Sequence, residues 1–276
     1  MRKKKKKIDE KHLFYGVAFL NLVPIRSKPS DGEVLVSQLL FGETCIILEK
    51  KNKHWFKIQV TTNDLIGWIN SLHIQLLDEA TFVEYNRSYS LSLEVSYPLF
   101  NEEMTKTICI GSRLPKFDGL SCFCKNDKFV FNGQAAPENG LDFTTELFKK
   151  IARRYLHTPE LRGGRSPFGI DAISFVQAVY GCFGYQIKHD LELQSQVGES
   201  IDFINLSQEG DLAFFMNDDG LVNHIGLLIG DQKIIHVFGH VRIDSIDHHG
   251  IFNYDLHKYT HKLRITKRVI SANKGL

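Results

Sequence analysis

The sequence predicts an α+β protein in which two small β-barrels precede a larger unit of helices followed by an antiparallel sheet. Two observations predict this order. Short apolar and polar alternations divided by turn residues run from Tyr15 to about residue 133, and this period of two is typical of strands. Near residue 144 the period changes to about 3.6, which is typical of a helix. We therefore predict a basic tail at 1–14, barrels at 15–78 and 79–136, and an α+β unit at 137–276.

The composition is that of a globular protein, with 43% hydrophobic and 24% charged residues. The formal net charge of +2 gives no global signal for nucleic acid, so no nucleic-acid partner is expected. The five cysteines are irregularly spaced and lack the CxxC pairs of zinc and redox sites. We expect reduced thiols that mostly pack in the core: Cys45, Cys109, Cys122, Cys124 and Cys182.

The chain carries no signal for a membrane span. No apolar run approaches the ~18–20 residues that cross a bilayer, and no signal-peptide core follows the N-terminal basic residues. We therefore expect a cytoplasmic protein. The lysine run at 3–7 is interpreted as a solvated tail, with an electrostatic tether to an anionic polymer or surface as the alternative.

Strand-like runs fill the two predicted barrels. The first barrel contains "VLVSQLLFGE", "TCIILEK", "HWFKIQV" and "LIGWINSLHIQLL", with turn residues between them. A weaker set begins at about Ala80 and contains "YSLSL", "TICIG", "SCFCKND" and "KFVFNG". We therefore predict two barrels in tandem.

Two helices are predicted to open the third unit. "TTELFKKIARRYLHTPEL" places Leu147, Ile151 and Tyr155 on one stripe. "DAISFVQAVYGCFG" follows a glycine-rich loop, with Asp171 at a plausible N-cap. The N-terminus of such a helix favours an anion and is a place where enzymes put a nucleophile, but here the first helical residue is Ala172.

Two histidines are candidates for catalytic work. His224 lies in "NHIGLLIG" and His236 in "KIIHVFG", both within apolar strand runs. Both are six residues from Gly230, so a hairpin there makes them cross-strand neighbours on one face. One imidazole then acts as a general base while the other fixes its tautomer and orientation. The alternative is a pair of buried histidines with no catalytic role, whose ring N–H groups donate hydrogen bonds to backbone carbonyls.

These motifs resemble a known family. "GGRSPFGID", "FVQAVYGCFGY", "EGDLAFF", "NHIGLLIG" and "KIIHVFGHVRID" are similar to the NlpC-type cell-wall cysteine peptidases, whose fold is papain-like. The two preceding barrels look like the bacterial SH3-like modules of γ-D-glutamyl-L-diamino acid endopeptidases. The resemblance implies that the nucleophile position falls on Ala172, the general base on His224 and the orienting residue on His236. It implies no cofactor and a murein peptide as partner.

Positions that the resemblance assigns to the substrate pocket depart from the family pattern. Family members carry a tyrosine and a tryptophan where this chain has Glu160 and Arg162, and a serine after the cysteine where it has Ile173. An expected arginine appears as His189, although the following Asp190 remains. The implied substrate-binding positions are Glu160, Arg162, Asp171, Ile173 and Asp190. We interpret the set as coordinated drift in a catalytically silent descendant, with deliberate redesign as the alternative.

No other group replaces the missing thiol in this interpretation. Ser174 lies about 200° around the helix from the expected position, and Cys182 lies roughly 15 Å along the axis. His236 and His240 are four apart on strand and turn, so they do not share a face as a helical zinc pair does, and no metal site is predicted.

The function predicted from the sequence is that of a binding or regulatory protein for cell-wall peptides that does not cleave them. The alternative is a cysteine peptidase acting on γ-D-Glu-diamino acid bonds whose nucleophile has been removed by substitution in this chain. We expect His224 and His236 to face Ala172 within roughly 8 Å. We also expect a ligand cleft between the barrels and the papain-like unit. No protein partner is indicated.

Overall fold

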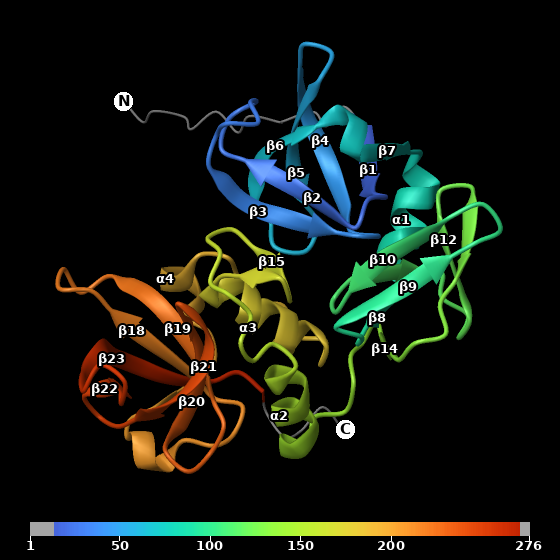
Figure 1. The fold of residues 1–276 in the computed structure, drawn as a ribbon. Helices are drawn as coiled ribbons and strands as arrows, with labels where there is room; N and C mark the ends of the chain where they lie inside the picture. The colour runs from blue at the N-terminus through green and yellow to red at the C-terminus, as the bar shows by residue number, and fades with distance from the viewer. Residues whose placement is uncertain (1–13, 271–276) are drawn as a thin grey trace, which may run out of the picture.

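The computed structural model describes residues 14–270, which form three consecutive units (Figure 1). The first unit is an antiparallel sheet of order β3-β2-β6-β5-β4-β1-β7 and agrees with the predicted first barrel. Alternate side chains, among them Val23, Ile47, Ile58 and Ile69, form its core. The lysine run at 3–7 lies outside the described residues. The strands are β1 (Phe14–Ala18), β2 (Leu22–Arg26), β3 (Leu35–Leu40), β4 (Thr44–Lys51), β5 (Trp55–Val60), β6 (Ile66–Asn70) and β7 (Ile74–Leu77), with a 3-10 turn, η1 (Ser71–His73), before β7.

The second unit differs from the predicted second barrel. It opens with a helix, α1 (Glu79–Arg87), where we expected strands; the Asp78 carboxylate caps this helix by accepting a hydrogen bond from Thr81 N. Its strands form two small sheets, β10-β9-β13-β12 and β11-β8-β14, which pack on the first unit through a core shared with Phe41. The strands are β8 (Tyr89–Ser92), β9 (Ser96–Phe100), β10 (Thr105–Cys109), β11 (Arg113–Pro115), β12 (Ser121–Cys124), β13 (Asp127–Val130) and β14 (Ala135–Pro137).

The third unit places its helices first and its antiparallel sheet second, as predicted. The sheet has the order β17-β23-β18-β19-β20-β21-β22, and β22 also pairs with β23, so six strands close into a barrel. The helices are α2 (Thr145–Arg153), α3 (Ala172–Gly181) and α4 (Leu191–Gln194), and η2 (Ile204–Leu206) is a 3-10 turn. The strands are β15 (Arg165–Ser166), β16 (Gly169–Ile170), β17 (Glu199–Ile201), β18 (Leu212–Met216), β19 (Val222–Leu228), β20 (Lys233–Phe238), β21 (His240–Ile246), β22 (Gly250–Asn253) and β23 (Lys258–Arg268).

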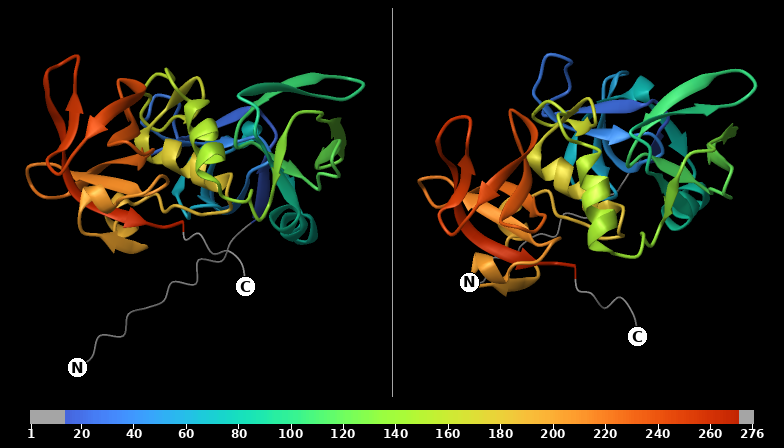
Figure 2. Two further views of the ribbon diagram at one scale, coloured as in Figure 1. Left: turned by 90° about the horizontal axis from the view of Figure 1, so that it is seen from below. Right: turned by 60° about the horizontal axis from the view of Figure 1, so that its bottom comes forward.

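Helices α2 and α3 lie between the C-terminal sheet and the two N-terminal units (Figure 2). The Asp171 carboxylate caps α3 by accepting a hydrogen bond from Ser174 N at 2.8 Å, so the predicted N-cap is confirmed. Phe175 and Val179 share one buried core with Ile225 of β19 and Ile235 of β20. The packing therefore sets α3 against the strands that carry the candidate histidines. No helix within residues 14–270 is long and apolar enough to cross a membrane.

The loop before α3 is tied to the first unit by a buried ion pair. Arg165 Nη1 and Nη2 donate to the two carboxylate oxygens of Glu43 at 2.7 and 3.0 Å, and Arg165 N donates to the side-chain oxygen of Gln38. Such a bidentate pair fixes orientation as well as distance. The first unit therefore helps to position the entry to α3.

The predicted register of the histidine hairpin is wrong by two residues. His236 pairs with Gly226 instead of His224, because the turn is centred on Asp231 rather than Gly230. Asp231 and Gln232 both take left-handed backbone conformations, with φ of 50° and 52°, and lengthen the turn. Because the shift is an even number, His224 and His236 still lie on the same face of the sheet.

Candidate functional site

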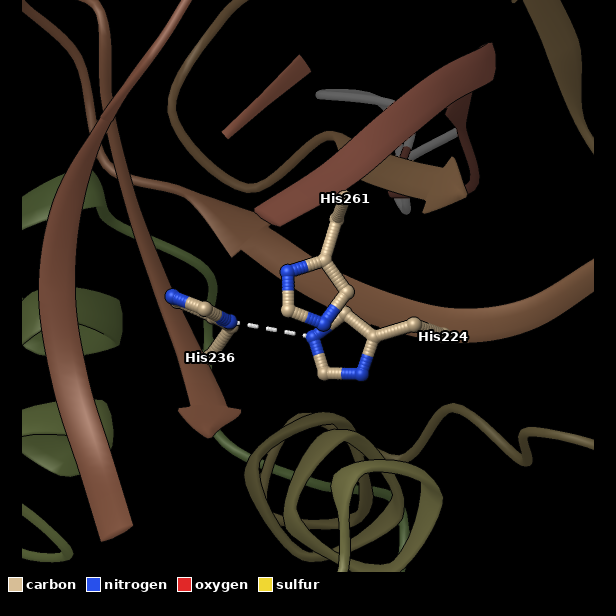
Figure 3. Close-up of side chains that lie close together, drawn as sticks. All are labelled: His224, His236 and His261. Carbon is tan, nitrogen blue, oxygen red and sulfur yellow. Dashed lines mark hydrogen bonds between the residues drawn. The ribbon is translucent and has the colours of Figure 1, made fainter. Parts of the chain in front are cut away.

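Two hydrogen bonds join three side chains from neighbouring strands into a relay. His224 Nε2 lies 3.0 Å from His236 Nδ1 (Figure 3), and His236 Nε2 lies 3.1 Å from Asp244 Oδ2. His224 comes from β19, His236 from β20 and Asp244 from β21. Their apolar neighbours in the strands, Ile225 and Ile235, belong to the core that packs on α3. The predicted orienting role of His236 therefore has a geometric basis, and Asp244 extends it.

Asp244 ends the relay as a buried carboxylate. Arg242 Nη2 donates to Asp244 Oδ1 at 3.0 Å, and Asn253 Nδ2 donates to Asp244 Oδ2 at 3.2 Å. Burial alone would raise the pKa of Asp244, but its hydrogen bonds with His236 and Arg242 and the Arg242 charge hold that pKa below its usual value. Asp244 is therefore ionised at neutral pH.

The carboxylate determines the tautomers of both histidines. An ionised carboxylate only accepts hydrogen bonds, so His236 Nε2 carries a proton and donates to Asp244. His236 Nδ1 then has a lone pair and accepts a hydrogen bond from His224 Nε2. The Nδ1 of His224 is then left with a free lone pair, and it makes no hydrogen bond within residues 14–270. In Figure 3 this nitrogen points toward α3, which is seen end-on beside His224. This nitrogen of His224 is therefore available to accept a proton, and the role of general base remains a prediction.

A third histidine, His261 of β23, completes the cluster, and our sequence analysis did not assign it to the site. Its ring stacks on that of His224 with centroids 4.1 Å apart and planes 28° from parallel. Its Nδ1 lies 2.9 Å from Thr260 Oγ1, while its Nε2 makes no hydrogen bond within the described residues. The rings of Phe215 and Phe238 contact its edges and give the cluster an apolar wall.

All three imidazoles are neutral at neutral pH. Burial is the main cause: it holds the pKa of His224 well below the usual value, with further lowering from His261 and His236. Burial also lowers the pKa of His236, partly offset by Asp244, and lowers that of His261 to about 4. Neutral imidazoles can accept a proton or bind a metal ion.

The start of α3 provides no reactive atom. Ala172 is half-buried and its side chain is a methyl group, and Ile173 beside it is buried. The Ser174 hydroxyl is buried and has no hydrogen-bond partner among residues 14–270, while burial raises the pKa of Cys182 to about 12. That thiol remains protonated, and all five cysteines are buried.

The other predicted pocket residues have mainly structural contacts. The Glu160 carboxylate accepts a hydrogen bond from Gly239 N at 2.7 Å, which ties it to the β20–β21 turn. Arg162 is exposed and forms no ion pair with Glu160 or any other residue between 14 and 270. Asp190 caps α4 by accepting a hydrogen bond from Leu193 N. A substrate-binding role for these residues remains a prediction.

A pocket does lie between the units, but it is separate from the histidines. Residues of the first unit, the second unit and the outer side of α3 line it, including Glu43, Arg113 and Gln177. Its volume is about 130 Å³, and neither Ala172 nor the relay histidines contribute to its lining. The interface therefore offers a cavity at a different place from the implied active site.

Asp244 was within reach of sequence reasoning, whereas His261 was not. A hairpin about Gly239 in "IIHVFGHVRID" places Arg242 opposite His236 and Asp244 one step diagonal to it, as the structure shows. His261 lies in the histidine-rich "LHKYTH", but it reaches His224 only because β23 packs beside β18 in the closed barrel. His240, which was considered with His236 as a zinc pair, instead stacks on His157.

Comparisons with known proteins agree with this architecture. A model of the NlpC/P60 family matches residues 158–260, and a model of the bacterial dipeptidyl-peptidase SH3 domain matches residues 25–74. The structure is similar to a crystal structure of an NlpC/P60 family protein from Bacillus cereus, with a TM-score of 0.79 and 19% identity over 93% of this chain and 100% of that chain. An NlpC/P60 endopeptidase from Photobacterium damselae has a TM-score of 0.71 and 17% identity over 93% of this chain and 71% of that chain.

Two curated relatives are similar in sequence, and both are named gamma-D-glutamyl-L-lysine dipeptidyl-peptidase. The Bacillus subtilis protein is 24% identical over 223 residues, which cover 74% of this chain and 72% of the relative. The Bacillus cereus protein is 35% identical over 240 residues, which cover 75% of this chain and 68% of the relative. Because the NlpC/P60 model matches residues 158–260 and the Bacillus cereus relative is 35% identical with 68% of its length covered, the chain belongs to the NlpC/P60 family.

Proposed function

We propose that this chain binds murein-type peptides beside the start of α3 and does not cleave them. The observation that carries the proposal is the combination of a complete His224–His236–Asp244 relay with a methyl group at the first position of α3. A relay of this kind accepts a proton and holds its own orientation, but it forms no covalent intermediate. The chain therefore has the geometry for recognition and lacks the group for nucleophilic attack.

The absence of a nucleophile has a large kinetic consequence. Removing the nucleophile of a well-studied serine protease lowers turnover by about 10⁶-fold. The buried Ser174 hydroxyl and the protonated Cys182 thiol provide no substitute. We therefore expect peptide hydrolysis to be slower by about this factor than in a relative that has the thiol.

Unpartnered polar groups near α3 support ligand binding. Ser174 Oγ and His189 Nδ1 are buried without a hydrogen-bond partner, and Asp171 influences His189 electrostatically. Buried polar atoms normally have hydrogen-bond partners, so Ser174 Oγ and His189 Nδ1 are suited to form hydrogen bonds with a ligand. Arg162 is exposed, and its guanidinium can pair with a carboxylate of the peptide. Both relatives are named as gamma-D-glutamyl-L-lysine dipeptidyl-peptidases, which suggests a peptide with a γ-D-Glu-L-Lys bond.

The intact relay also favours a second candidate function. A cysteine peptidase in which only the nucleophile had been replaced would keep His224, His236 and Asp244 in this arrangement. In that case the form of the chain that has cysteine at position 172 hydrolyses the γ-D-Glu-L-Lys bond. The substituted pocket positions Glu160, Arg162 and Ile173 favour the binding function over this alternative.

Calorimetry with the peptide L-Ala-γ-D-Glu-L-Lys tests the proposal. We expect saturable binding that Arg162→Ala weakens and that Arg153→Ala, an exposed arginine on α2, leaves unchanged. Mass spectrometry of the same mixtures should show no release of L-Ala-D-Glu. Release at a rate typical of an active peptidase would contradict the lack of cleavage, and an absence of heat at millimolar peptide would contradict binding.

A further inference from the structure

Three histidine side chains from three strands converge beneath the surface of the C-terminal barrel. His224, His236 and His261 each offer a ligand nitrogen, and these three nitrogens all lie within 4.8 Å of one another. The rings of His224 and His261 are stacked, and the ring of His236 stands at 86° and 84° to them (Figure 3). Only His224 and His236 have roles in the relay, so the position of His261 calls for its own explanation.

The outer nitrogens of two rings are already held, which leaves the inner ones free to bind. His236 Nε2 is engaged by Asp244, and His261 Nδ1 by Thr260. His236 Nδ1, His261 Nε2 and His224 Nε2 are then the nitrogens that face the middle of the cluster, as Figure 3 shows. A metal-bound histidine in proteins usually has its second nitrogen fixed in this way by a carboxylate or another oxygen.

We propose that His224, His236 and His261 form a binding site for one divalent late transition-metal ion of the zinc class. Zinc binds histidine nitrogen at about 2.0–2.1 Å, so two nitrogens of a tetrahedral site are about 3.3 Å apart. His224 Nε2 and His236 Nδ1 are already 3.0 Å apart. A small movement of the three rings, with His261 moving most, brings all three nitrogens to bonding distance.

Binding of the ion requires one shift of a proton and no net loss. In the relay the proton lies on His224 Nε2 and is shared with His236 Nδ1. When the ion takes the Nε2 lone pair, this proton moves to His224 Nδ1, which has no hydrogen-bond partner within residues 14–270. His236 keeps its proton on Nε2 toward Asp244, and the carboxylate strengthens His236 as a ligand. Charge and protons therefore balance.

The donor set selects the class of ion. Three neutral imidazole nitrogens suit zinc, nickel or copper, whereas calcium and magnesium require oxygen ligands. Burial keeps the three imidazoles unprotonated at neutral pH, so protons compete little with the metal. Three protein ligands leave a fourth position for water or an anionic group, as in catalytic zinc sites. A surface pocket lined in part by Asn223, Thr260 and His261 gives the ion a route from solvent.

Titration of the metal-free, tag-free full chain with zinc chloride in a calorimeter tests the site directly. We expect one zinc ion per chain. His261→Phe keeps an aromatic ring against Phe215 and removes the ligand, so it should weaken binding more than the ~10–100-fold typical of an outer-shell partner. Asp244→Asn should weaken binding by ~10–100-fold. His249→Phe is the matched control, an exposed histidine beside the same surface pocket, and should bind zinc like the parent.

Cobalt(II) replaces zinc in a second measurement that needs no variant. Coordination by three imidazoles and one water should give the visible absorption bands of tetrahedral cobalt. Visible bands that zinc abolishes support the site. An absence of one-to-one zinc binding, an absence of these bands, or equal zinc affinity in His261→Phe and the parent would overturn it. Because the probe is the metal alone, these outcomes do not depend on whether the chain binds a murein peptide.

Discussion

The relay strands and the start of α3 differ in how completely their buried polar atoms are paired. His224, His236, Asp244 and Arg242 form one continuous set of hydrogen bonds and ion pairs. Beside it, the buried Ser174 hydroxyl of α3 has no hydrogen-bond partner within residues 14–270, and the first residue of α3 is Ala172, whose side chain is only a methyl group. The relay side chains are held by one another, with His224 Nδ1 left open, whereas the Ser174 hydroxyl is held by no hydrogen bond within the described residues.

This difference separates orientation from reaction. The relay depends on residues of adjacent strands, so the barrel supplies its geometry whatever residue begins α3. The chemistry of attack depends on one side chain at the helix N-terminus, and its replacement leaves the fold intact. A buried group without a partner loses a hydrogen bond that water made in the unfolded chain, so a ligand that restores the bond gains affinity. The comparison therefore supports binding by the α3 region and proton acceptance by the relay.

The largest expected effect comes from placing a thiol opposite the relay. Ala172→Cys should recover part of the ~10⁶-fold deficit in hydrolysis of a γ-D-Glu-L-Lys peptide. We expect its rate to remain at least about 10²-fold below that of the Bacillus cereus relative, because Ile173, Glu160 and Arg162 orient the substrate poorly. Steady-state kinetics of the two proteins measures the difference.

Thiol reactivity sharpens the same comparison without a substrate. In Ala172→Cys the helix N-terminus and His224 should lower the pKa of the new thiol, so iodoacetamide should alkylate it rapidly near pH 6.5. Ala178→Cys, on the same helix near its C-terminal end, is the matched control and should react slowly. Full peptidase turnover from Ala172→Cys would favour the substituted-peptidase alternative. Equal alkylation of the two variants would instead show that His224 does not face position 172.

The relay should make the protein less stable in mild acid. Burial lowers the pKa of His224, His236 and His261, whereas histidines in the unfolded chain titrate near pH 6.5. As pH falls below about 6.5, the histidines of the unfolded state bind protons that those of the folded state do not bind, so the free energy of unfolding decreases. The contribution is fully present above about pH 7 and is lost toward the folded values, which for His261 is about 4. Asp244, whose pKa is also lowered, titrates below this window.

Thermal unfolding between about pH 7.5 and about pH 5 measures this effect. We expect the midpoint to fall by at least about 5 °C in the metal-free parent. His261→Phe removes one of the three groups and should give a smaller fall, while His249→Phe should follow the parent. A midpoint that does not change over this range would mean that the three imidazoles are not buried together.

Local signals in the sequence predicted much of the fold. The Asp171 cap and the apolar stripe of α3 are set by neighbouring residues, and the structure confirms both. Helix α1 was missed because its apolar pattern is weak and its start depends on one cap, Asp78. The second unit forms two sheets instead of one barrel, and their pairing depends on contacts with the first unit that no short segment reveals.

The candidate site shows the same limit. The facing of His224 and His236 was predicted correctly although the register was not, because a shift of two residues leaves a side chain on the same face. Asp244 was not predicted, although a hairpin with its turn at Gly239 places it diagonal to His236. His261 depended on closure of the barrel, in which β23 returns beside β18 after five other strands, and this long-range pairing has no local signature.

The smallest expected effect compares the N-caps of two helices, α3 and α4. Asp171 accepts hydrogen bonds from Ser174 N and from Gly163 N, whereas the exposed Asp190 accepts only that of Leu193 N, on a short helix. Asp171→Ala should therefore lower the free energy of unfolding by about 2 kcal/mol and Asp190→Ala by about 0.5 kcal/mol, measured from urea midpoints. Asp171→Asn keeps one accepting oxygen for Ser174 N but presents an amide to Gly163 N, so its cost should lie between the two. Equal costs for the two alanine variants would mean that the second hydrogen bond of Asp171, which joins the glycine loop to α3, adds nothing to stability.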